Sequence, residues 1–528
     1  MCGISGIIGP IATEHLLKEL LDPIAHRGEL RYRHETLIRS GLAIGTHRLA
    51  IVDEVTGKQP VQDSHQRVFC VFNGEIYNHA ALRKELVSHH SFFSNCDSEV
   101  VLKAYLQWGD DFAKYLDGKF AIFIFDEAKN ISILARDPMG VKPLYYTKYQ
   151  ESWLFSSELK SFSSINDEDL EILEIEPGSI WKNGEIKKHF TLERFLKTPS
   201  NDSLFSMQPA FKSHLFKAVA KRIPKEADRI ACLLSGGIDS SVITYLASQI
   251  HPHVVAYTLA APHMPSADLQ AAKTLSQHCN IEHVVVSPSV QEMQKLYLEE
   301  GVYMTESFEP VLVRNAVSYH FVCRQIAKDG FKHCLNGEGA DELFGGYDFV
   351  REAPASRQDD VIWHSLSIIH KTYLQMADRA SMYATLEARV PYLDKDLIAF
   401  CLSLPPEARI SGDKNKVILR QSFKDELPES IINRKKTGMN EGAGFGINAT
   451  KESIYYKAVE AYYGQYPNQF DKDIALCKTV KIRQIDLTDI EEIYNFAKFS
   501  RLKYTHLKGS MMKLQLNTRL KPEILCNS

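Results

Sequence analysis

The 528-residue chain lacks long hydrophobic runs, and its longest apolar stretches are as short as 120–125. About 20 consecutive apolar residues are needed to cross a membrane, so no membrane span or membrane partner is expected. The 28 glycines and 21 prolines are too few for a collagen-like or low-complexity disordered chain. With 44% hydrophobic and 24% charged residues, the composition is that of a globular protein.

A strong net charge is also missing. The formal value of −4 gives no reason to expect a nucleic-acid partner. The first residues, MCGISGIIGP, lack the basic start and long apolar core of a secretory signal. The ten cysteines include no CxxC pair, so neither a zinc site nor a disulfide framework is predicted. We therefore expect a cytoplasmic protein with reduced thiols.

The first 190 or so residues predict a domain dominated by a sheet. Short runs rich in Val, Ile, Phe and Tyr are bounded by Gly, Asp or Asn, which is typical of β-strands. We expect a mostly antiparallel sheet with helices packed on it. The predicted strands are 41–53, 67–77, 120–126, 131–137 and 152–157, and the predicted helices lie near 12–25 and 98–115.

After a polar candidate linker at 193–205, helical segments alternate with short apolar runs. This order predicts a parallel sheet with crossover helices. Length alone would suggest three or four domains, whereas the linker divides the chain into two, 2–193 and 206–528. The predicted strands are 229–234, 253–258 and 282–286, and the predicted helices are 207–222, 240–250, 266–278, 311–329, 361–386, 395–403 and 415–425. The basic tail, 501–528, is expected to be a solvated charged end.

Cys2 is the one cysteine with a special position. Removal of Met1 would free its α-amine, whose pKa is about 7.7–8.0. Such an amine can act as the general base for a nucleophile on the same residue. Taken alone, a cysteine at position 2 is weak evidence for this chemistry.

Six further motifs follow Cys2. They are HRG (26–28), THRLAIVD (46–53), NGEIYNH (73–79), NCDSEV (95–100), RDPMGVKPLYY (136–146) and FSSELKSF (155–162). In this order and spacing the series resembles the glutamine amidotransferase domain of the N-terminal-nucleophile type. The resemblance covers 2–190 and implies an α+β domain, an αββα sandwich of antiparallel sheets, with glutamine as nitrogen donor. The usual HRGPD has become HRGEL, so we expect a changed loop near the site.

The resemblance also implies a set of glutamine contacts. Thiolate attack on a carboxamide makes an oxyanion that needs hydrogen-bond donors, a role that falls to Asn73 and the Gly74 N–H. Arg48 supplies a planar fork for the α-carboxylate, and Asp97 a countercharge for the α-ammonium; a surface ion pair is the alternative for these two. Ile51, Val52 and Glu75 complete the implied glutamine site.

A second motif, IACLLSGGIDSSVI (230–243), reads as an apolar strand, a Gly-Gly turn and a helix start. Glycines allow close approach to phosphates, and a helix N-terminus offers free N–H groups. The GK[ST] of a P-loop is missing. The SGGxDS pattern instead resembles the loop of ATP pyrophosphatases, which split ATP into AMP and pyrophosphate. By this resemblance the pyrophosphate end is held by Ser235, Gly236, Gly237, Asp239 and Ser240, with Asp239 also a candidate Mg²⁺ ligand.

Three later segments resemble asparagine synthetases: LNGEGADELFGGY (335–347), DRASMYATLEARVPYLD (378–394) and RKKTGMNEGAGF (434–445). The resemblance implies that Glu338 and Asp341 contact the acceptor, with Glu338 serving as a base or orienting the nucleophile and Asp341 as a second Mg²⁺ ligand. Lys436 would meet the developing phosphate charge. Leu233 and Tyr257 would flank the adenine, and Asn336 with Gly337 would line the nucleotide pocket. Ordinary salt bridges are the alternative for the charged positions.

The two halves together predict one reaction. Glutamine would be hydrolysed to ammonia, ATP would activate a carboxylate as an acyl-adenylate, and ammonia would attack it to give an amide. A dry passage between the domains would keep the ammonia unprotonated. The whole chain resembles the glutamine-hydrolysing asparagine synthetase family, which implies an α/β ATP pyrophosphatase domain with extra helices, small-molecule substrates and a homodimer.

The acceptor remains open in the sequence. Where the family has Thr-Thr-Ile-Arg, this chain keeps Arg314, a candidate carboxylate clamp, but has Val311 and Leu312 in place of the threonines. Asn336 replaces the usual serine. Aspartate is the default acceptor, and another carboxylic acid in a biosynthetic pathway is the alternative. A degenerate binding protein is disfavoured by the intact motifs, and a β-lactam-closing relative by Cys2.

Overall fold

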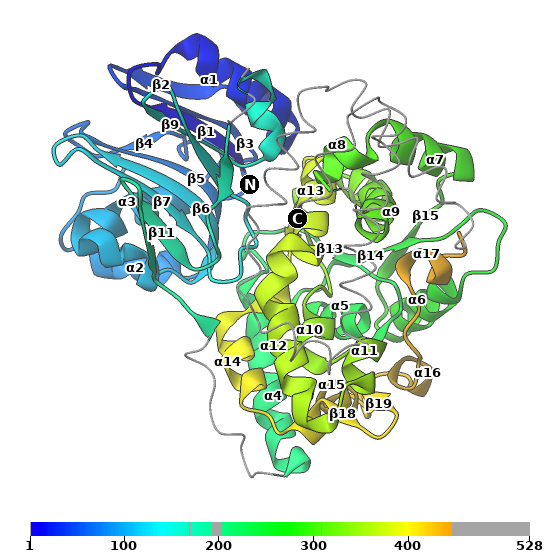
Figure 1. The fold of residues 1–528 in the computed structure, drawn as a ribbon. Helices are drawn as coiled ribbons and strands as arrows, with labels where there is room; N and C mark the ends of the chain where they lie inside the picture. The colour runs from blue at the N-terminus through cyan, green and yellow to red at the C-terminus, as the bar shows by residue number, and fades with distance from the viewer. Residues whose placement is uncertain (1, 166, 168–169, 193–202, 308, 446–528) are drawn as a thin grey trace.

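The computed structural model describes residues 2–165, 167, 170–192, 203–307 and 309–445. The predicted tail, 501–528, and residues 193–202 of the predicted linker lie outside them. The described chain forms two halves that lie side by side (Figure 1). No helix in these ranges is long and apolar enough to cross a membrane.

The N-terminal half contains two six-stranded sheets, ordered β10-β8-β9-β1-β3-β2 and β12-β11-β7-β6-β5-β4. Every neighbouring pair of strands in these two sheets runs antiparallel, as predicted. The first sheet consists of β1 (Cys2–Ile8), β2 (Glu35–Arg39), β3 (Leu42–Arg48), β8 (Tyr145–Tyr149), β9 (Ser152–Ser156) and β10 (Ile172–Glu174). The second consists of β4 (Val61–Gln62), β5 (Val68–Ile76), β6 (Gly118–Asp126), β7 (Ile131–Arg136), β11 (Ser179–Lys182) and β12 (Glu185–Lys188).

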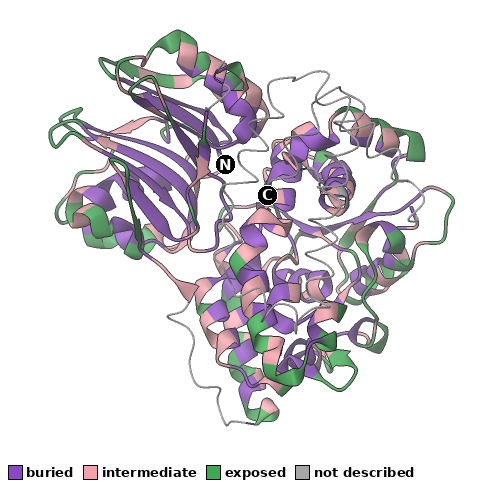
Figure 2. Ribbon diagram, viewed as in Figure 1, coloured by how far each residue is buried: buried purple, intermediate pink, exposed green. Residues whose placement is uncertain are grey.

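Strand β5 shows why the sheets stack. Its side chains alternate between two cores, as the period of a strand requires. Phe69 and Val71 face the core between the sheets, whereas Cys70 and Phe72 face the core under the helices α2 (His79–Leu86) and α3 (Asp97–Trp108). On the outer face of the first sheet lies α1 (Glu14–Leu21). The result is the predicted αββα sandwich, with purple sheets inside and greener helices outside in Figure 2.

The C-terminal half is built on a five-stranded sheet of order β15-β14-β13-β16-β17, with every neighbouring pair parallel. Its strands are β13 (Ile230–Leu233), β14 (Val254–Leu259), β15 (Glu282–Val286), β16 (His333–Leu335) and β17 (Glu387–Arg389). The chain leaves β13 toward β14 on one side and returns as β16 on the other. Ligands of open α/β sheets bind at the carboxyl ends of strands beside such a reversal, which is where the loop 234–237 lies.

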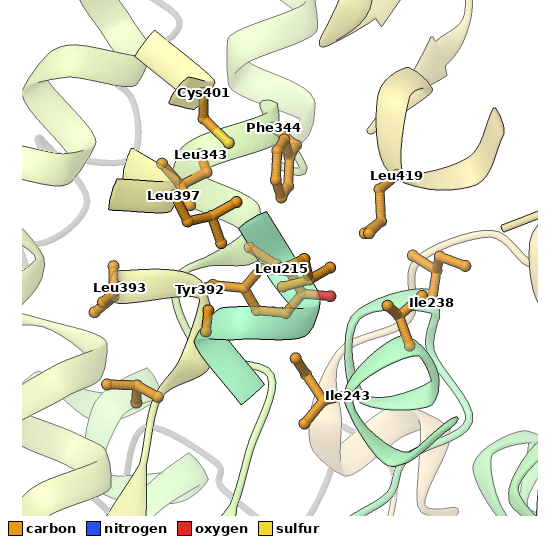
Figure 3. Close-up of a cluster of buried hydrophobic side chains, with 14 of the residues drawn as sticks. Leu215, Ile238, Ile243, Leu343, Phe344, Tyr392, Leu393, Leu397, Cys401 and Leu419 are labelled. Atoms are coloured by element: carbon orange, nitrogen blue, oxygen red, sulfur yellow. The ribbon is translucent and has the colours of Figure 1, made fainter. Parts of the chain in front are cut away.

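Helices cover this sheet (Figure 1). They are α4 (Leu204–Lys221), α5 (Ile238–Ile250), α6 (Ala267–His278), α7 (Val290–Glu299), α8 (Gly301–Thr305), α9 (Pro310–Lys328), α10 (Ala340–Phe344), α11 (Asp348–Glu352), α12 (Gln358–Ile368), α13 (Tyr373–Met382), α14 (Lys395–Leu402), α15 (Val417–Ser422), α16 (Glu429–Ile432) and α17 (Met439–Gly442). The apolar core under the loop joins α5, α10 and α14: Figure 3 shows Ile238, Phe344 and Leu397 around Tyr392. A packed core fixes the loop because protein interiors tolerate few voids.

Two predicted elements are wrong in extent. The strand 41–53 ends at Arg48, because the chain then becomes a loop in which Asp53 has φ +50°. The helix 361–386 is broken at Thr372, whose φ and ψ of −123° and −107° are not helical. The Thr372 hydroxyl donates to the Ile369 carbonyl (3.3 Å), a local bond that competes with the helix.

Buried ion pairs join the two halves. The Arg27 guanidinium donates to both carboxylate oxygens of Asp378, at 2.8 and 3.1 Å, and to Glu158 at 2.5 Å. Lys142 reaches Asp378 at 2.6 Å. Arg27 is fully buried, and Asp378 is 4% exposed. Burial alone would raise the pKa of Asp378, but Arg27 and Lys142 hold it well below its ordinary value.

Asp378→Asn should therefore destabilise the protein by about 3–5 kcal/mol, because it leaves two buried cations without their anion. Urea unfolding of the full chain measures the change. The matched control is Asp360→Asn, since Asp360 pairs with Arg357 (2.6 Å) on the surface and such pairs contribute about 0–1 kcal/mol. Equal midpoints for the two variants would contradict a stabilising role for the interdomain pairs.

Candidate functional site

Cys2, the predicted nucleophile, lies at the start of β1. Its backbone nitrogen, the predicted amine, donates to Oδ1 of Asn73 (3.1 Å). The side-chain Nε2 of Gln59 donates to the Sγ of Cys2 (3.7 Å). Gln59 also bonds the backbone of Phe72 in both directions, at 2.7 and 3.1 Å. Gln59 thus anchors β5 beside the thiol. No motif marked this residue in the sequence.

The predicted oxyanion donors, Asn73 and Gly74, lie on β5, and Asn73 bonds the backbone nitrogen of Cys2. Because Oδ1 of Asn73 accepts from Cys2, its Nδ2 faces elsewhere, and that buried atom has no partner among the described residues. Gly74 is needed for strand packing: a Cβ there would lie 2.2 Å from the Lys119 carbonyl. The Nδ2 of Asn73 is thus a donor available to the predicted oxyanion.

Arg48 ends β3, opposite Cys2 in the register of the first sheet. Its Nε lies 3.2 Å from a carboxylate oxygen of Glu35, and its guanidinium lies 4.1 Å from the centre of the Tyr32 ring. The predicted neighbours Ile51 and Val52 follow in the loop after β3 and are half-buried. In the described structure Arg48 is thus already paired with one carboxylate, that of Glu35. Its binding of glutamine stays a prediction.

The two predicted acidic contacts have different surroundings. Asp97 begins α3, accepts from the Ile76 N–H (3.0 Å), and has a pKa raised by burial. Glu75 is buried against Arg389 of the other half, with which it forms a close ion pair. Asp97 is therefore a carboxylate without a cationic partner in the described residues, whereas Glu75 already has one.

The loop after β13 is held in shape by its own hydroxyls. Ser240 Oγ accepts from the Ser235 N–H (3.2 Å), and the two hydroxyls lie 3.1 Å apart. Gly236 has φ +70°, and a Cβ there would lie 2.5 Å from Ala271. A Cβ at Gly337 would lie 3.0 Å from the Ser240 nitrogen. The structure thus brings the 235–240 loop against Gly337, which follows β16.

Two carboxylates and two lysines meet beside this loop. Lys416 Nζ lies 2.5 Å from Asp239 and 2.6 Å from Asp341, and Lys436 forms a close ion pair with Asp341. Burial alone would raise the pKa of Asp341, but the two lysines hold it below its ordinary value. Lys416 was not predicted, because nothing in the sequence distinguishes it from the exposed Lys414.

These residues fit a magnesium–nucleotide complex. Oδ1 of Asp239 is buried without a hydrogen-bond partner among the described residues. The Gly346 backbone packs so closely that a Cβ would lie 1.8 Å from Asp341 Oδ1. Within the described ranges no cluster of three or more His, Cys, Asp or Glu could hold a metal unaided. One or two carboxylates plus substrate phosphates is the coordination that Mg²⁺ usually accepts.

Glu338 lies next to these groups, and its environment disfavours its charge. Burial, together with Glu342 and Asp341, raises the pKa of Glu338 to about 8. Its N–H donates to Asn336 Oδ1 (3.2 Å), so the turn after β16 orients it. Glu342 accepts from the Tyr347 hydroxyl (2.6 Å), and burial raises its pKa to about 7. A carboxyl group with a pKa near neutrality is suited to proton transfer.

If Glu338 accepts the proton of the attacking nitrogen, only its ionised form works, and turnover should rise with pH through about 8. Glu338→Gln should be slow and lack this rise. Glu342→Gln removes a neighbouring negative charge and should shift the rise to lower pH. Hydroxylamine is the nitrogen source for this measurement, because it is a weaker base than ammonia and stays unprotonated. An unchanged profile in Glu338→Gln would rule out this role.

One predicted site residue has its side chain turned away from the loop, although its backbone carbonyl accepts from the Leu234 N–H (2.9 Å). Tyr257 was expected to flank the adenine, but its side chain is 2% exposed and its hydroxyl donates to Asp329 (2.7 Å), which follows α9. Asp329 lies before β16, whereas the loop follows the carboxyl ends of the strands. Tyr257 is therefore a core residue. Leu233, which pairs with it in register, is half-buried and stays a prediction.

The replaced threonine positions lie at the start of α9. Leu312 is 4% exposed and belongs to the core, and its N–H is capped by the Glu309 carboxylate (2.7 Å). Val311 is half-buried. Nε of Arg314, one turn along, is buried and has no partner among the described residues. The guanidinium that was predicted to clamp an acceptor carboxylate therefore has an unused donor.

Two family models match the chain. Residues 1–192 match the glutamine amidotransferase domain model, and residues 210–367 and 354–458 match the asparagine synthase model. The nodule asparagine synthetase [glutamine-hydrolyzing] of Pisum sativum is 30% identical, with 84% of this chain and 79% of the relative covered. Asparagine synthetase B [glutamine-hydrolyzing] of Escherichia coli is 30% identical, with 86% and 84% covered. The chain therefore belongs to the glutamine-hydrolysing asparagine synthetase family.

Proposed function

We propose that this protein makes asparagine from aspartate, with glutamine as nitrogen donor and ATP cleaved to AMP and pyrophosphate. Residues 2–193 would hydrolyse glutamine, and residues 206–528 would activate and amidate the acid. The observation that carries the proposal is the presence of two sites in one chain: Cys2 bonded to Asn73, and the Asp239–Lys416–Asp341 cluster beside the 234–237 loop.

In the first half-reaction, the free amine of Cys2 takes the thiol proton and the thiolate attacks the glutamine carboxamide. The oxyanion is stabilised by Asn73 Nδ2 and the Gly74 N–H. The carbon–nitrogen bond breaks as the amine returns the proton to the leaving ammonia, and water then releases glutamate. Arg48 and Asp97 hold the α-carboxylate and α-ammonium of the substrate. The unpartnered Asn73 Nδ2 supports this assignment.

In the second half-reaction, the aspartate carboxylate attacks the α-phosphate of ATP and pyrophosphate leaves. Ser235, Gly236, Gly237 and Ser240 bind the pyrophosphate end through N–H and hydroxyl groups. Mg²⁺ held by Asp239 and Asp341 would neutralise phosphate charge when bound. Lys436 stabilises the charge on the departing pyrophosphate.

Ammonia then attacks the acyl carbon of the adenylate. Glu338 takes one of its protons, the carbon–oxygen bond to AMP breaks, and asparagine results. Asn336 and Gly337 border the nucleotide, and Arg314 holds a carboxylate of aspartate. The unused Nε of Arg314 and the raised pKa of Glu338 support these two roles. The two relatives described above are both asparagine synthetases, which supports aspartate as the acceptor.

A panel of carboxylic acids tests the proposal. Purified protein with glutamine, ATP and Mg²⁺ should release pyrophosphate and AMP with aspartate, and the product should be identified as asparagine. Succinate, which lacks the α-amine, is the matched control and should give little turnover. Turnover with another acid, and none with aspartate, would show that the other acid is the acceptor substrate. No AMP or pyrophosphate with any acid would favour a binding protein instead.

A further inference from the structure

His333 is a buried histidine at the start of β16. His333 is 8% exposed, and neither nitrogen of its ring has a hydrogen-bond partner among the described residues. Leaving a buried polar atom unpaired costs free energy, and here both nitrogens of one ring are affected. A small molecule that can both donate and accept a hydrogen bond would satisfy them.

The ring lies at the boundary between the halves. His333 begins β16 and pairs with Glu387 of β17, so the two side chains share a face of the sheet with Arg389. On that face Lys119 reaches Glu387 (2.8 Å), and Arg389 pairs with Glu75. Glu75 is two residues beyond Asn73 on β5, so these ion pairs lie between the strand that carries Asn73 and the start of β16, where His333 lies.

The neighbouring residues connect to both sites. Lys332 donates to the Ala50 carbonyl (2.8 Å), within the loop that carries the predicted glutamine contacts. In the other direction β16 leads to Glu338 beside the acceptor site. His333 thus lies at the glutaminase end of a strand whose other end leads into the synthetase site.

The charge state of the His333 ring suits the binding of a neutral molecule. Burial, with Arg389 and Lys119 nearby, holds the pKa of His333 well below its ordinary value, although Glu387 opposes this. A neutral imidazole has one donor and one acceptor nitrogen. Ammonia likewise has N–H donors and one lone pair, and a neutral ring has no proton to give it.

We propose that His333 hydrogen-bonds ammonia during its passage from Cys2 to Glu338, and so couples the two half-reactions. The inference rests on the proposed function and extends it by one positioning residue. No bond is made or broken at the ring; the histidine supplies a resting point with one donor and one acceptor.

The test is the amount of glutamate formed per pyrophosphate released, measured with glutamine, ATP and aspartate. His333→Leu keeps a similar volume without the nitrogens. We expect its ratio to rise at least about threefold over the wild-type value, while glutamine hydrolysis and ammonia-driven synthesis stay within about twofold. Its melting temperature should rise, because two unpaired polar atoms are removed. His333→Asn, which keeps a donor and an acceptor, should restore most of the coupling.

His320→Leu is the matched control, since His320 is also buried and has a pKa lowered by burial to about 4, but bonds the Ala380 carbonyl (3.1 Å) within its own half. Its ratio should equal that of the wild type. A wild-type ratio in both His333 variants would overturn the proposal and leave the histidine a packing residue, whatever the melting temperature. Absent ammonia-driven synthesis in the wild type would instead contradict the proposed function.

Discussion

Cys2→Ala is expected to lower glutamine-dependent pyrophosphate release by at least about 1000-fold, because loss of a nucleophile removes the covalent route entirely. Ammonia-dependent release should stay within about twofold of the wild type. The backbone bond from residue 2 to Asn73 does not involve the thiol and should persist. Both rates are measured by a pyrophosphate assay with glutamine or an ammonium salt as the only nitrogen source.

Cys70→Ala is the control for this experiment. Cys70 lies on β5 in the same half, is fully buried, and has a pKa raised by burial, so its thiol is inert. Its removal should leave both rates close to the wild type. If glutamine-driven turnover survived in Cys2→Ala, the assignment of the nucleophile would be wrong; loss of both rates would indicate damage beyond the thiol.

Asp239→Asn should have the opposite pattern. Pyrophosphate release should fall at least about 100-fold with either nitrogen source, since a charged group is removed where phosphate and metal charge must be balanced. Lys416 would lose one of its two carboxylate partners at the same time. Glutamate formation from glutamine, followed separately, should continue because Cys2 and Asn73 are untouched.

Asp348→Asn is the matched change for Asp239→Asn, because Asp348 is an exposed residue of the same half that forms a surface ion pair with Arg351 (3.0 Å). It should behave as the wild type. Pyrophosphate release by Asp239→Asn at the control rate would exclude Asp239 from the nucleotide site. A parallel fall in glutamine hydrolysis would mean that the two sites depend on each other more than their separate contacts suggest.

Local signals made much of both sites predictable. Strand–glycine–helix order located the 234–237 loop, and α5 begins two residues from the expected start. Position 2 marked the proposed nucleophile, and the NGE motif marked its neighbour Asn73. Each of these features spans only a few consecutive residues. The residues that act together there are close along the chain or belong to one recognisable motif, so the sequence alone reveals them.

Residues that act across long sequence separations could not be predicted in this way. Lys416 meets Asp239 across 177 positions, and Gln59 meets Cys2 across 57. Each lies in a segment with no periodicity or motif of its own. Tyr257 failed for the opposite reason: a strand position near the site says nothing about whether the side chain is already bonded in the core, as it is to Asp329.

The ionic character of the domain boundary has a consequence for biosynthesis. The first half is complete before the residues that pair with Arg27, Lys142 and Glu75 have been made, and domains fold in order during synthesis. Because these groups are charged, the unfinished face can be hydrated while it waits, whereas an apolar face would be an aggregation hazard. The N-terminal half can thus fold during synthesis before the C-terminal half has been made, and the C-terminal half can then fold against it.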